Sequence, residues 1–443
     1  MKRTTLFFLL NFLSIGLLAQ QIEFEEYDLA NGLHVILHQD QSTPMVVTSV
    51  LYKVGPKDEA KNRTGFAHFF EHLLFEETQN IPRGKWSTIV TSRGGQNNAY
   101  TSGNYTYYYE ALPANELDLA LWMESERMLH PIIGEKGVAT QNEVVKEEKR
   151  LRYDNRPYGK WFISVYENLF TQHPYQHSPI GKMADLDAAT LDEFLAFNNQ
   201  FYVPNNAVLT VAGAFDIDEA KQKIAAYFGP IPKGANIERN YPVEPEIMST
   251  INAKTYDPNI QLPALLLAYK TPGESNRDNQ VLEMIASYLS GGKSAKLYKR
   301  MVDEEKIALQ ISTYNFSDAL YSPFMFFTIP LGETPLTILQ KTIDEEIATL
   351  QEELIAEQDY QKLLNQFESQ FVSTNASVSG IANSLAHNYV IHGDTNLINT
   401  QIDLYRSITR EEIRAVAQKY LNPNQRLELE YLPEPQAENP NKS

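Results

Sequence analysis

The segment Arg63-Thr-Gly-Phe-Ala-His-Phe-Phe-Glu-His-Leu-Leu-Phe75 decides how the first half of the chain is arranged. Its apolar residues recur every three to four positions, which is the spacing of one face of an α-helix. Thr64 has the side chain of a helix N-cap, so the pattern predicts a helix from Gly65 to about Glu77. A strand-like alternation from Gly32 to Asp40 and a β-rich run from Val46 to Val54 precede this helix. The sequence therefore predicts two strands that lead into one buried helix.

Two histidines in this helix are four residues apart. Side chains with that spacing project from the same helix face, so His68 and His72 can reach one metal ion. Glu71 also lies there, where a carboxylate can take a proton from a water molecule that the metal activates. The order His-x-x-Glu-His is the reverse of the common zincin motif. Such a match arises by chance in about one sequence of this size in a hundred, so the helical context carries part of the interpretation.

A zinc site of this kind needs a third protein ligand, and the chain contains no cysteine. The candidates are carboxylates of a Glu-rich helix predicted from Val138 to Arg152, namely Glu143, Glu147 and Glu148. Basic residues are interspersed with these glutamates, so most of this helix is expected to be a solvated charged face. Spacing alone does not choose among the three carboxylates.

The composition limits the class of protein. Hydrophobic residues make up 43% of the chain and charged residues 21%, as in soluble globular proteins. The net charge of -18 argues against nucleic acid as a partner, because a phosphate backbone is bound by a basic surface. The absence of cysteine excludes disulfides and thiolate metal sites. A length of 443 residues favours two domains or more.

The N-terminus has the pattern of an export signal. Lys2 and Arg3 precede an apolar stretch from Leu6 to Leu18, and the small residue Ala19 follows. This stretch is short for a membrane span and lacks a stop-transfer flank, so residues 1–20 are expected to be a cleaved signal peptide. The alternative is an uncleaved anchor. We therefore expect an exported protein, most consistent with the periplasm, without a stable membrane span.

One pattern occurs twice, about 219 residues apart. The first copy runs from Thr190 through a capped helix to a turn at Pro204 and then a strand, and the second runs from Thr409 to Pro423 in the same way. A period of this size is that of a domain, so the pattern predicts a duplicated unit of the α+β class.

The duplication predicts the domain organisation. Residues 21–235 are expected to form a zinc-binding catalytic domain, and residues 259–435 a second, homologous domain without a metal site. The polar, proline-bearing stretch 236–258 is the expected linker. Residues 436–443 are expected to be a disordered tail.

Several segments together resemble the pitrilysin-type metallopeptidases, the inverted zincins that include insulysin and the mitochondrial processing peptidase. Besides the helix motif, the resemblance rests on Tyr52 to Glu59, Gly94 to Thr101, Ala120 to Met128, Gln141 to Glu148 and Phe201 to Val211. These segments cover the first half densely, whereas the second half is similar by pattern alone. The chain resembles the zinc-bearing subunit of the small two-domain bacterial type.

The resemblance implies a fold and a metal site. Two related α+β domains, each a mixed sheet covered by helices, would form half of a clamshell. His68 and His72 would bind one Zn²⁺ per chain, and Glu71 would be the general base. Glu148 matches the position of the third ligand in the family and is therefore the ligand that the resemblance implies.

The resemblance also implies a substrate and a function. Asn98, Ala99 and Tyr100 would form an edge strand that pairs with an extended substrate, and backbone pairing tolerates many sequences. The expected function is that of a zinc endopeptidase subunit that hydrolyses peptides or small unfolded proteins. The alternative is a non-catalytic peptide-binding or scaffold subunit of a processing complex, although such family members usually lose the three motif residues.

Two features depart from the family pattern. A glutamate that the family often has seven residues before the third ligand is Gln141 here, so lower zinc affinity or activity is expected. Family members also carry an Arg and a Tyr, seven apart, that stabilise the oxyanion. The aligned residues are Val302 and Leu309, which cannot donate a hydrogen bond. A shift of one turn toward Arg300 is the alternative alignment, but it does not restore the pair. We therefore expect a homologous partner chain to supply these groups in a heterodimer.

Seven other histidines are scattered along the sequence and are expected to be mostly ordinary surface or core residues: His34, His38, His130, His173, His177, His387 and His392. His34 and His38 are predicted on one strand and can share a face, but no third ligand accompanies them. No second metal site is therefore predicted.

Overall fold

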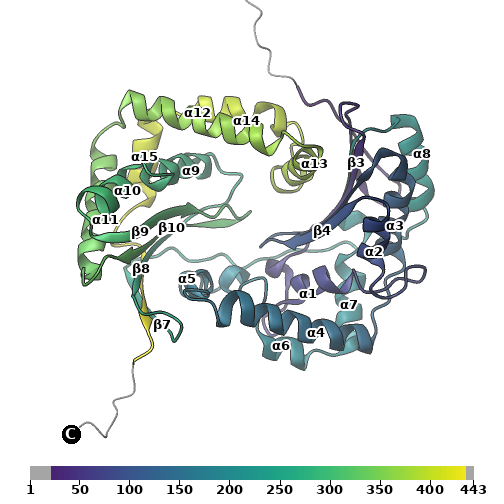
Figure 1. Ribbon diagram of the computed structural model, residues 1–443, viewed down its shortest axis with the longest axis horizontal. Coiled ribbons are helices and arrows are strands. Elements are labelled where there is room, and N and C mark those ends of the chain that lie inside the picture. Colours follow the sequence, from purple (N-terminus) through teal and green to yellow (C-terminus); the bar gives the residue numbers. More distant parts are fainter. Residues whose placement is uncertain (1–20, 436–443) are drawn as a thin grey trace, which may run out of the picture.

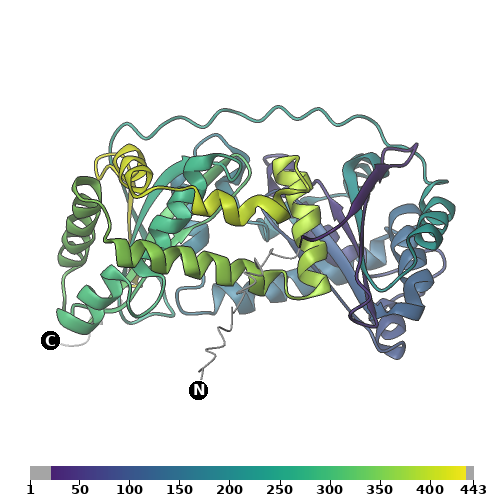
Figure 2. The ribbon, with the colours of Figure 1, turned by 90° about the horizontal axis from the view of Figure 1, so that it is seen from above.

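The computed structural model describes residues 21–435, so the predicted signal peptide and the predicted disordered tail lie outside the described residues. Two halves, each built on one sheet, are joined by a long extended segment that runs along one side of the molecule (Figures 1 and 2). Among residues 21–435, no helix is both long and apolar enough to span a bilayer.

The first half contains a six-stranded mixed sheet with the order β1-β2-β6-β3-β5-β4. Its strands are β1 (Glu25–Asp28), β2 (His34–Gln39), β3 (Met45–Tyr52), β4 (Gln96–Thr101), β5 (Thr106–Pro113) and β6 (Ala207–Gly213). β2 and β6 are parallel, and the other neighbouring strands are antiparallel. β4 is a terminal strand of this sheet, so one of its edges is not paired within it.

The first half contains the helices of residues 66–228, most of which pack on one face of this sheet or beside it. They are α1 (Phe66–Leu73), α2 (Trp86–Ser92), α3 (Leu117–Leu129), α4 (Glu135–Lys149), α5 (Trp161–Leu169), α6 (Met183–Ala188), α7 (Leu191–Phe201) and α8 (Ile217–Phe228). The apolar faces of α1, α3, α7 and α8 form one buried core with β2, β3, β5 and β6. The motif helix α1 is therefore anchored in the largest core of the first half.

The second half contains a five-stranded sheet with the order β7-β11-β8-β10-β9. Its strands are β7 (Ile251–Asp257), β8 (Ala264–Pro272), β9 (Ala308–Asn315), β10 (Tyr321–Pro330) and β11 (Leu427–Pro433). Its helices are α9 (Arg277–Ser290), α10 (Lys296–Tyr298), α11 (Leu336–Glu352), α12 (Glu357–Thr374), α13 (Val378–His387), α14 (Leu397–Arg406) and α15 (Arg410–Tyr420). The predicted α+β class, with mixed sheets covered by helices, is confirmed.

The repeated sequence pattern corresponds to a repeated structure. Thr190 and Thr409 each accept a hydrogen bond from the backbone of a glutamate three residues later, as N-caps of α7 and α15. β6 follows α7 and pairs parallel with β2 and antiparallel with β3. β11 follows α15 and pairs parallel with β7 and antiparallel with β8. The two halves therefore share one topology around their central strands.

The expected linker is shorter than the sequence suggested. The expectation extended it to residue 258, whereas β7 already begins at Ile251 and pairs in register with β11. Half-buried and exposed side chains alternate along β7 up to its last residue, as expected for the edge of a sheet. The polar composition of this strand reflects its position at an edge of the sheet, and the sequence alone does not distinguish that from a linker.

The start of α1 also differs from the prediction. Gly65, rather than Thr64, precedes the first helical residue, and its φ of +94° lies in the left-handed region that favours glycine. Glu59 accepts the backbone N–H groups of Gly65 and Ala67, both at 2.7 Å, and thereby performs the capping role. The helix ends at Leu73, four residues earlier than predicted.

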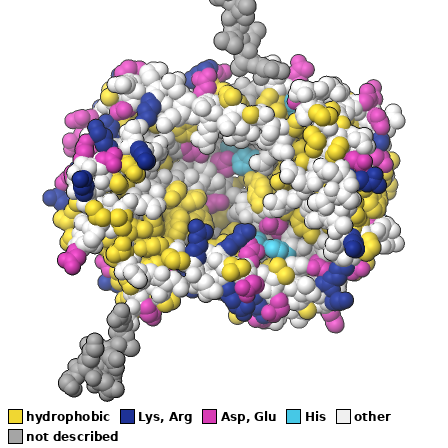
Figure 3. All heavy atoms as spheres, in the orientation of Figure 1, with side chains coloured by type: hydrophobic (Ala, Val, Ile, Leu, Met, Phe, Trp, Pro, Cys, Tyr) yellow, Lys and Arg dark blue, Asp and Glu magenta, His cyan; other side chains and the backbone are white. Residues whose placement is uncertain are grey.

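Each sheet has one face covered by a helix from the opposite half of the sequence. Helix α13 of the second half packs on β2, β3 and β6, where Leu385 is buried against Ile36, Leu51 and Val208. Helix α5 of the first half packs in the same way on β7, β8 and β11. Figure 1 shows α13 beside β3 and α5 beside β8. Figure 3, drawn in the orientation of Figure 1, shows that the surface of the molecule is hollowed between the two halves.

Shortening one buried side chain of α13 tests how much this helix contributes to the stability of the protein. Leu385→Ala removes a fully buried side chain between the halves, so the free energy of unfolding is expected to fall by about 2–5 kcal/mol. Val372→Ala, at an exposed position of α12, is the control and is expected to stay within about 0.5 kcal/mol of wild type. Urea denaturation of the three proteins measures the difference. A Leu385 variant as stable as the control would contradict the packing described here.

Candidate metal centre

Helices α1 and α4 bring three side chains together. Nε2 of His72 lies 3.1 Å from Oε2 of Glu148, and Nε2 of His68 lies 3.5 Å from the same oxygen. The ligand atoms of all three residues lie within 4.8 Å of one another. Two imidazole nitrogens and one carboxylate oxygen therefore converge from two neighbouring helices.

The three glutamates that spacing left open on α4 have different surroundings. The side chain of Glu148 is 15% exposed, whereas those of Glu143 and Glu147 are 70% and 57% exposed. Glu143 pairs with Lys146, and Glu147 pairs with Arg150, on the solvated face. The structure therefore brings Glu148, and neither of the other two glutamates, to the histidines.

The protonation states suit a cation. Burial, and then the neighbouring His72, lowers the pKa of His68 to about 4, so its imidazole is neutral at pH 7 and can act as a ligand. Burial raises the pKa of Glu148, but the imidazoles and the guanidinium of Arg152 lower it by more, so the group is a carboxylate. Oε2 of Glu148 is buried without a well-aligned hydrogen bond. Two imidazoles beside such an unsatisfied carboxylate oxygen fit Zn²⁺ with one position open.

Glu71 is held by the edge strand of the first sheet. Its Oε2 accepts a hydrogen bond of 2.6 Å from the hydroxyl of Thr101, the last residue of β4. Burial raises the pKa of Glu71 above its ordinary value, which brings a carboxylate closer to the range of a base at neutral pH. Thr101 belongs to a segment that carried the family resemblance, but the sequence did not identify it as the partner of Glu71.

Arg152 is a second residue that the sequence did not identify. Its Nη1 lies 3.0 Å from Oε1 of Glu148, four residues earlier in the sequence. It belongs to a π-helical turn, η3 (Arg150–Asp154), that continues α4. The guanidinium thus holds one carboxylate oxygen while the other faces the imidazoles. An opposite charge four residues along a helix is the signal that was available in the sequence.

Buried polar side chains hold both ends of α1. Glu59 accepts backbone N–H groups at the N-terminus, and Nη1 of Arg127 donates to the carbonyl of Leu74 at the C-terminus, at 2.9 Å. Arg127 is itself buried between Glu110 and Glu124. A positive group at the end of a helix is what the helix dipole favours. Both histidines therefore project from a firmly held helix.

The predicted substrate strand lies at the sheet edge next to this site. Asn98, Ala99 and Tyr100 are residues of β4, which pairs with β5 on one side and lies beside α1 (Figure 1). The hydroxyl of Tyr100 donates to Oδ1 of Asn383 in α13, at 2.7 Å. Because Thr101 ends the same strand and holds Glu71, a segment added to this edge would pass the candidate base.

Val302 and Leu309, the residues that the resemblance aligns with the oxyanion pair, have side chains that cannot donate a hydrogen bond. Val302 lies in the π-helical turn η6 (Lys299–Glu304), and Leu309 is 50% exposed on β9. Arg300, the residue that an alternative alignment would bring in, is bound by three carboxylates, those of Glu305, Glu345 and Glu346. Its guanidinium is therefore held by ion pairs within the second half.

Gln141 contacts a residue outside the metal centre. Its amide donates to Oε1 of Glu76, and Nε of Arg83 lies 2.5 Å from the other oxygen of that carboxylate. Gln141 therefore ties α4 to the segment after α1 without bonding to His68 or Glu148.

Comparisons with known proteins are informative over most of the chain. The family model described as "Insulinase (Peptidase family M16)" matches residues 34–180, and that described as "Peptidase M16 inactive domain" matches residues 188–367. The zinc protease PqqE of Helicobacter pylori (strain ATCC 700392 / 26695) is 28% identical over 404 residues, which cover 90% of this chain and 91% of that protein.

Solved structures share the fold. The crystal structure of a protease from Helicobacter pylori has a TM-score of 0.87 and 27% identity, and the match covers 93% of this chain and 100% of that one. The periplasmic protease PqqL from Escherichia coli has a TM-score of 0.75 at 17% identity, and the match covers 92% of this chain and 47% of that one. PqqL is therefore about twice as long as the region that it shares with this chain.

The contact of Gln141 predicts the effect of restoring the family glutamate. Gln141→Glu replaces the donor to Glu76 by a second carboxylate, so the free energy of unfolding at pH 7 is expected to fall by about 1–3 kcal/mol. The matched control is Gln361→Glu, which makes the same change beside Glu357 on an exposed face and should cost about 0.5 kcal/mol or less. Urea denaturation compares the variants. A stabilised Gln141→Glu protein would be incompatible with this contact.

Proposed function

Because this chain belongs to the insulinase family of metallopeptidases, peptidase family M16, we propose that it is the zinc-bearing subunit of an exported endopeptidase. Its substrates are peptides or small unfolded proteins. The observation that carries the proposal is the convergence of His68, His72 and Glu148 beside Glu71, whose carboxylate is held by Thr101.

The ligands for zinc are His68, His72 and Glu148. A Zn²⁺ ion bound there supplies Lewis-acid chemistry, polarising the scissile carbonyl and acidifying a water molecule. Glu71 takes the proton of that water as its oxygen attacks the carbonyl carbon. Glu71 then gives the proton to the amine nitrogen as the C–N bond breaks. The hydroxyl of Thr101 occupies one oxygen of Glu71 and leaves the other for proton transfer.

The position of β4 supports a preference for extended, unfolded substrates. A substrate strand that pairs with the open edge of β4 is recognised through its backbone, so the sequence requirement is weak. Asn98 and Ala99 lie on this strand and Thr101 ends it, which aligns the paired segment with Glu71. Folded proteins usually cover or blunt their edge strands, whereas an unfolded segment has its backbone free to pair.

A partner chain completes the site in this proposal. Val302 and Leu309 stand where the family has its oxyanion donors, and the guanidinium of Arg300 is engaged by carboxylates. A homologous subunit that carries an Arg and a Tyr, closing over the hollow, would supply the missing donors. The length of PqqL, about twice that of the matched region, supports an arrangement of two such units. Its description as a periplasmic protease, with the export pattern of residues 1–20, supports the periplasm as the location.

Replacement of the candidate base tests the mechanism. Glu71→Gln keeps the shape but cannot take a proton, so peptide hydrolysis is expected to fall by about 10²–10⁴-fold. Zinc content, measured by mass spectrometry of the metal, should stay unchanged. The matched control is Glu147→Gln, an exposed glutamate on α4 that should retain wild-type activity. The proteins are purified from the native source through an affinity tag, so that any partner is retained. Equal activity of wild type and Glu71→Gln would remove Glu71 from the mechanism.

The partner is tested by comparing the chain alone with the tagged complex from the native source. Loss of oxyanion donors costs about 10²–10³-fold in related chemistry, so the chain alone is expected to be slower by that factor. Hydrolysis of a quenched fluorescent peptide measures the rate, and light scattering measures the mass of each preparation. Full turnover by a homogeneous preparation of this chain would refute the heterodimer. Absence of activity and of zinc from the native complex would instead favour the non-catalytic subunit.

A further inference from the structure

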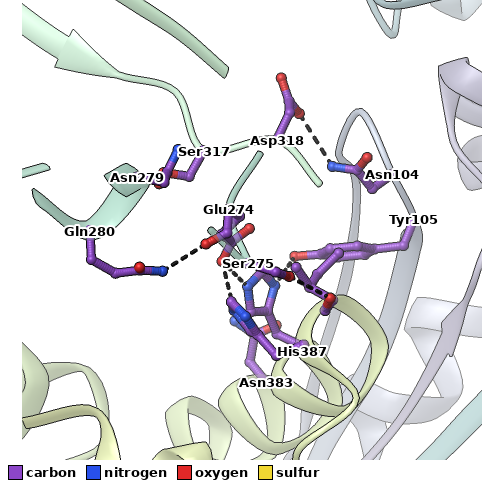
Figure 4. Close-up of polar contacts among 12 residues, drawn as sticks. Asn104, Tyr105, Glu274, Ser275, Asn279, Gln280, Ser317, Asp318, Asn383 and His387 are labelled. Atoms are coloured by element: carbon purple, nitrogen blue, oxygen red, sulfur yellow. Dashed lines mark hydrogen bonds and ion pairs between the residues drawn. The ribbon is translucent and has the colours of Figure 1, made fainter. Parts of the chain in front are cut away.

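A second group of metal-binding side chains lies in the other half of the protein. Nε2 of His387 is 2.6 Å from Oε1 of Glu274, and Nε2 of His392 is 3.3 Å from the same oxygen. The ligand atoms of the three residues lie within 4.8 Å of one another. Figure 4 shows Glu274 and His387 pointing toward each other from different segments. Both histidines are among the scattered residues for which the sequence predicts no metal site.

The local helix geometry brings the two histidines to one side. Helix α13 ends at His387 and continues as a π-helical turn, η7 (Asn388–His392), closed by the left-handed Gly393. The N–H of Gly393 bonds to the carbonyl of Asn388, five residues earlier, which is the π-helical pattern. Residues five apart then lie on one face, and the two imidazole rings are 6.0 Å apart between centroids. In an α-helix the same spacing would turn them to different faces.

Glu274 lies in a well-anchored loop between β8 and α9. Its backbone N–H donates to the carbonyl of Asp318, and its carbonyl accepts from the amide of Gln280. The next residue, Ser275, donates its hydroxyl to the carbonyl of Ile391 within η7, at 2.9 Å. The side chain of Ser275 thus joins the loop to the backbone of the π-helical turn. The three ligand atoms are brought together by rigid neighbours, with no need for a long flexible side chain.

A tyrosine from the first half orients His387. The hydroxyl of Tyr105 lies 3.1 Å from Nδ1 of His387 (Figure 4). The same hydroxyl lies 3.2 Å from that of Tyr100. Tyr100 in turn donates to Asn383 of α13. A hydrogen bond at Nδ1 fixes the ring so that Nε2 faces Glu274, which is the usual support of a metal-binding histidine. The cluster is therefore tied to the hairpin of β4 and β5.

The charges around the cluster favour a cation. The three side chains are 13–26% exposed and line a cavity of about 580 Å³. A further carboxylate, Glu283, lines the same cavity and accepts hydrogen bonds from Ser317 and Tyr405. Of the residues that line this cavity, none is a lysine or an arginine. Two carboxylates therefore face a common space that holds no protein cation other than a protonated histidine.

From these observations we infer that Glu274, His387 and His392 form a second binding site for a divalent transition metal, of which Zn²⁺ fits best. Two imidazoles and one carboxylate are the ligands that select such ions over Mg²⁺ and Ca²⁺, which prefer oxygen alone. The metal joins the loop of Glu274 to the end of α13 and, through Tyr105, steadies the hairpin that carries the candidate substrate strand. The chain then binds two metal ions instead of the one expected from the sequence. This inference does not depend on the proposed peptidase activity.

The experiment separates the two sites by metal stoichiometry in the full chain. Co²⁺ is the probe, because its visible absorption reports coordination by nitrogen and oxygen ligands. The wild type is expected to bind two Co²⁺ per chain. His72→Ala, which disables the first centre, and His392→Gln, which disables the second, are each expected to bind one. The control His130→Gln changes a histidine outside both clusters and should bind two.

Two results would overturn the second site. The first is a His72→Ala chain that binds no Co²⁺, which needs no substitution within the cluster and so does not depend on the folding of His392→Gln. The second is a folded His392→Gln chain, checked by circular dichroism, that binds as much Co²⁺ as wild type. In that case the cluster is a hydrogen-bonded ion pair without metal. In the His72→Ala background, His392→Gln should weaken the remaining Co²⁺ binding by more than about 10-fold, because a ligand matters more than its supporting contacts.

Discussion

Burial of the second face of each sheet is the constraint on which the rest of this structure depends. The strands of both sheets carry apolar residues on two faces, and the helices of one half cover one face. The other face is closed by a helix that crosses over, α13 on the first sheet and α5 on the second. Burying one large apolar side chain is worth about 1.5–3 kcal/mol, so separating the halves would expose several such groups at once. The two crossing helices, α5 and α13, therefore hold the two halves at one relative orientation around the hollow.

That orientation matters for the site, because the second half supports residues of the first. Asn383 of α13 accepts the hydroxyl of Tyr100 on the edge strand, and His387 bonds to Tyr105 at the start of the adjoining strand. The edge strand in turn holds Glu71 through Thr101. A chain of contacts thus runs from the second half to the candidate base. The half without the His-x-x-Glu-His motif still takes part in positioning it.

The charged groups of the two halves are used differently. In the first half, Oε2 of Glu148 is buried without a well-aligned hydrogen bond and faces the imidazole of His72. In the second half, three carboxylates form ion pairs with the guanidinium of Arg300. The geometry of the first half therefore suits metal binding and proton transfer, whereas Val302 and Leu309, which the resemblance aligns with the oxyanion donors, cannot donate a hydrogen bond from their side chains. This asymmetry is the physical basis of the proposed heterodimer.

The sequence by itself determined the features that depend on neighbours along the chain. The spacing of four between His68 and His72 places them on one helix face, and the capping boxes at Thr190 and Thr409 mark the duplicated unit. The family resemblance, rather than spacing, pointed to Glu148, because α4 offers other glutamates at its surface. The cap of α1 was mispredicted, since Glu59 reaches its N–H groups from outside the helix.

Tertiary structure alone decided the features that depend on distant segments or unusual backbone. The sequence does not reveal that α5 and α13 cross to the opposite half. Amphipathic periodicity shows which face of a helix is buried, but not which sheet that face covers. Thr101 and Arg152 acquire their roles from packing and from a π-helical turn after α4. His387 and His392, five residues apart, share a face because the backbone between them is π-helical, and their third neighbour, Glu274, is more than a hundred residues away. Local periodicity carries no information about such a meeting, which only the packed fold brings about.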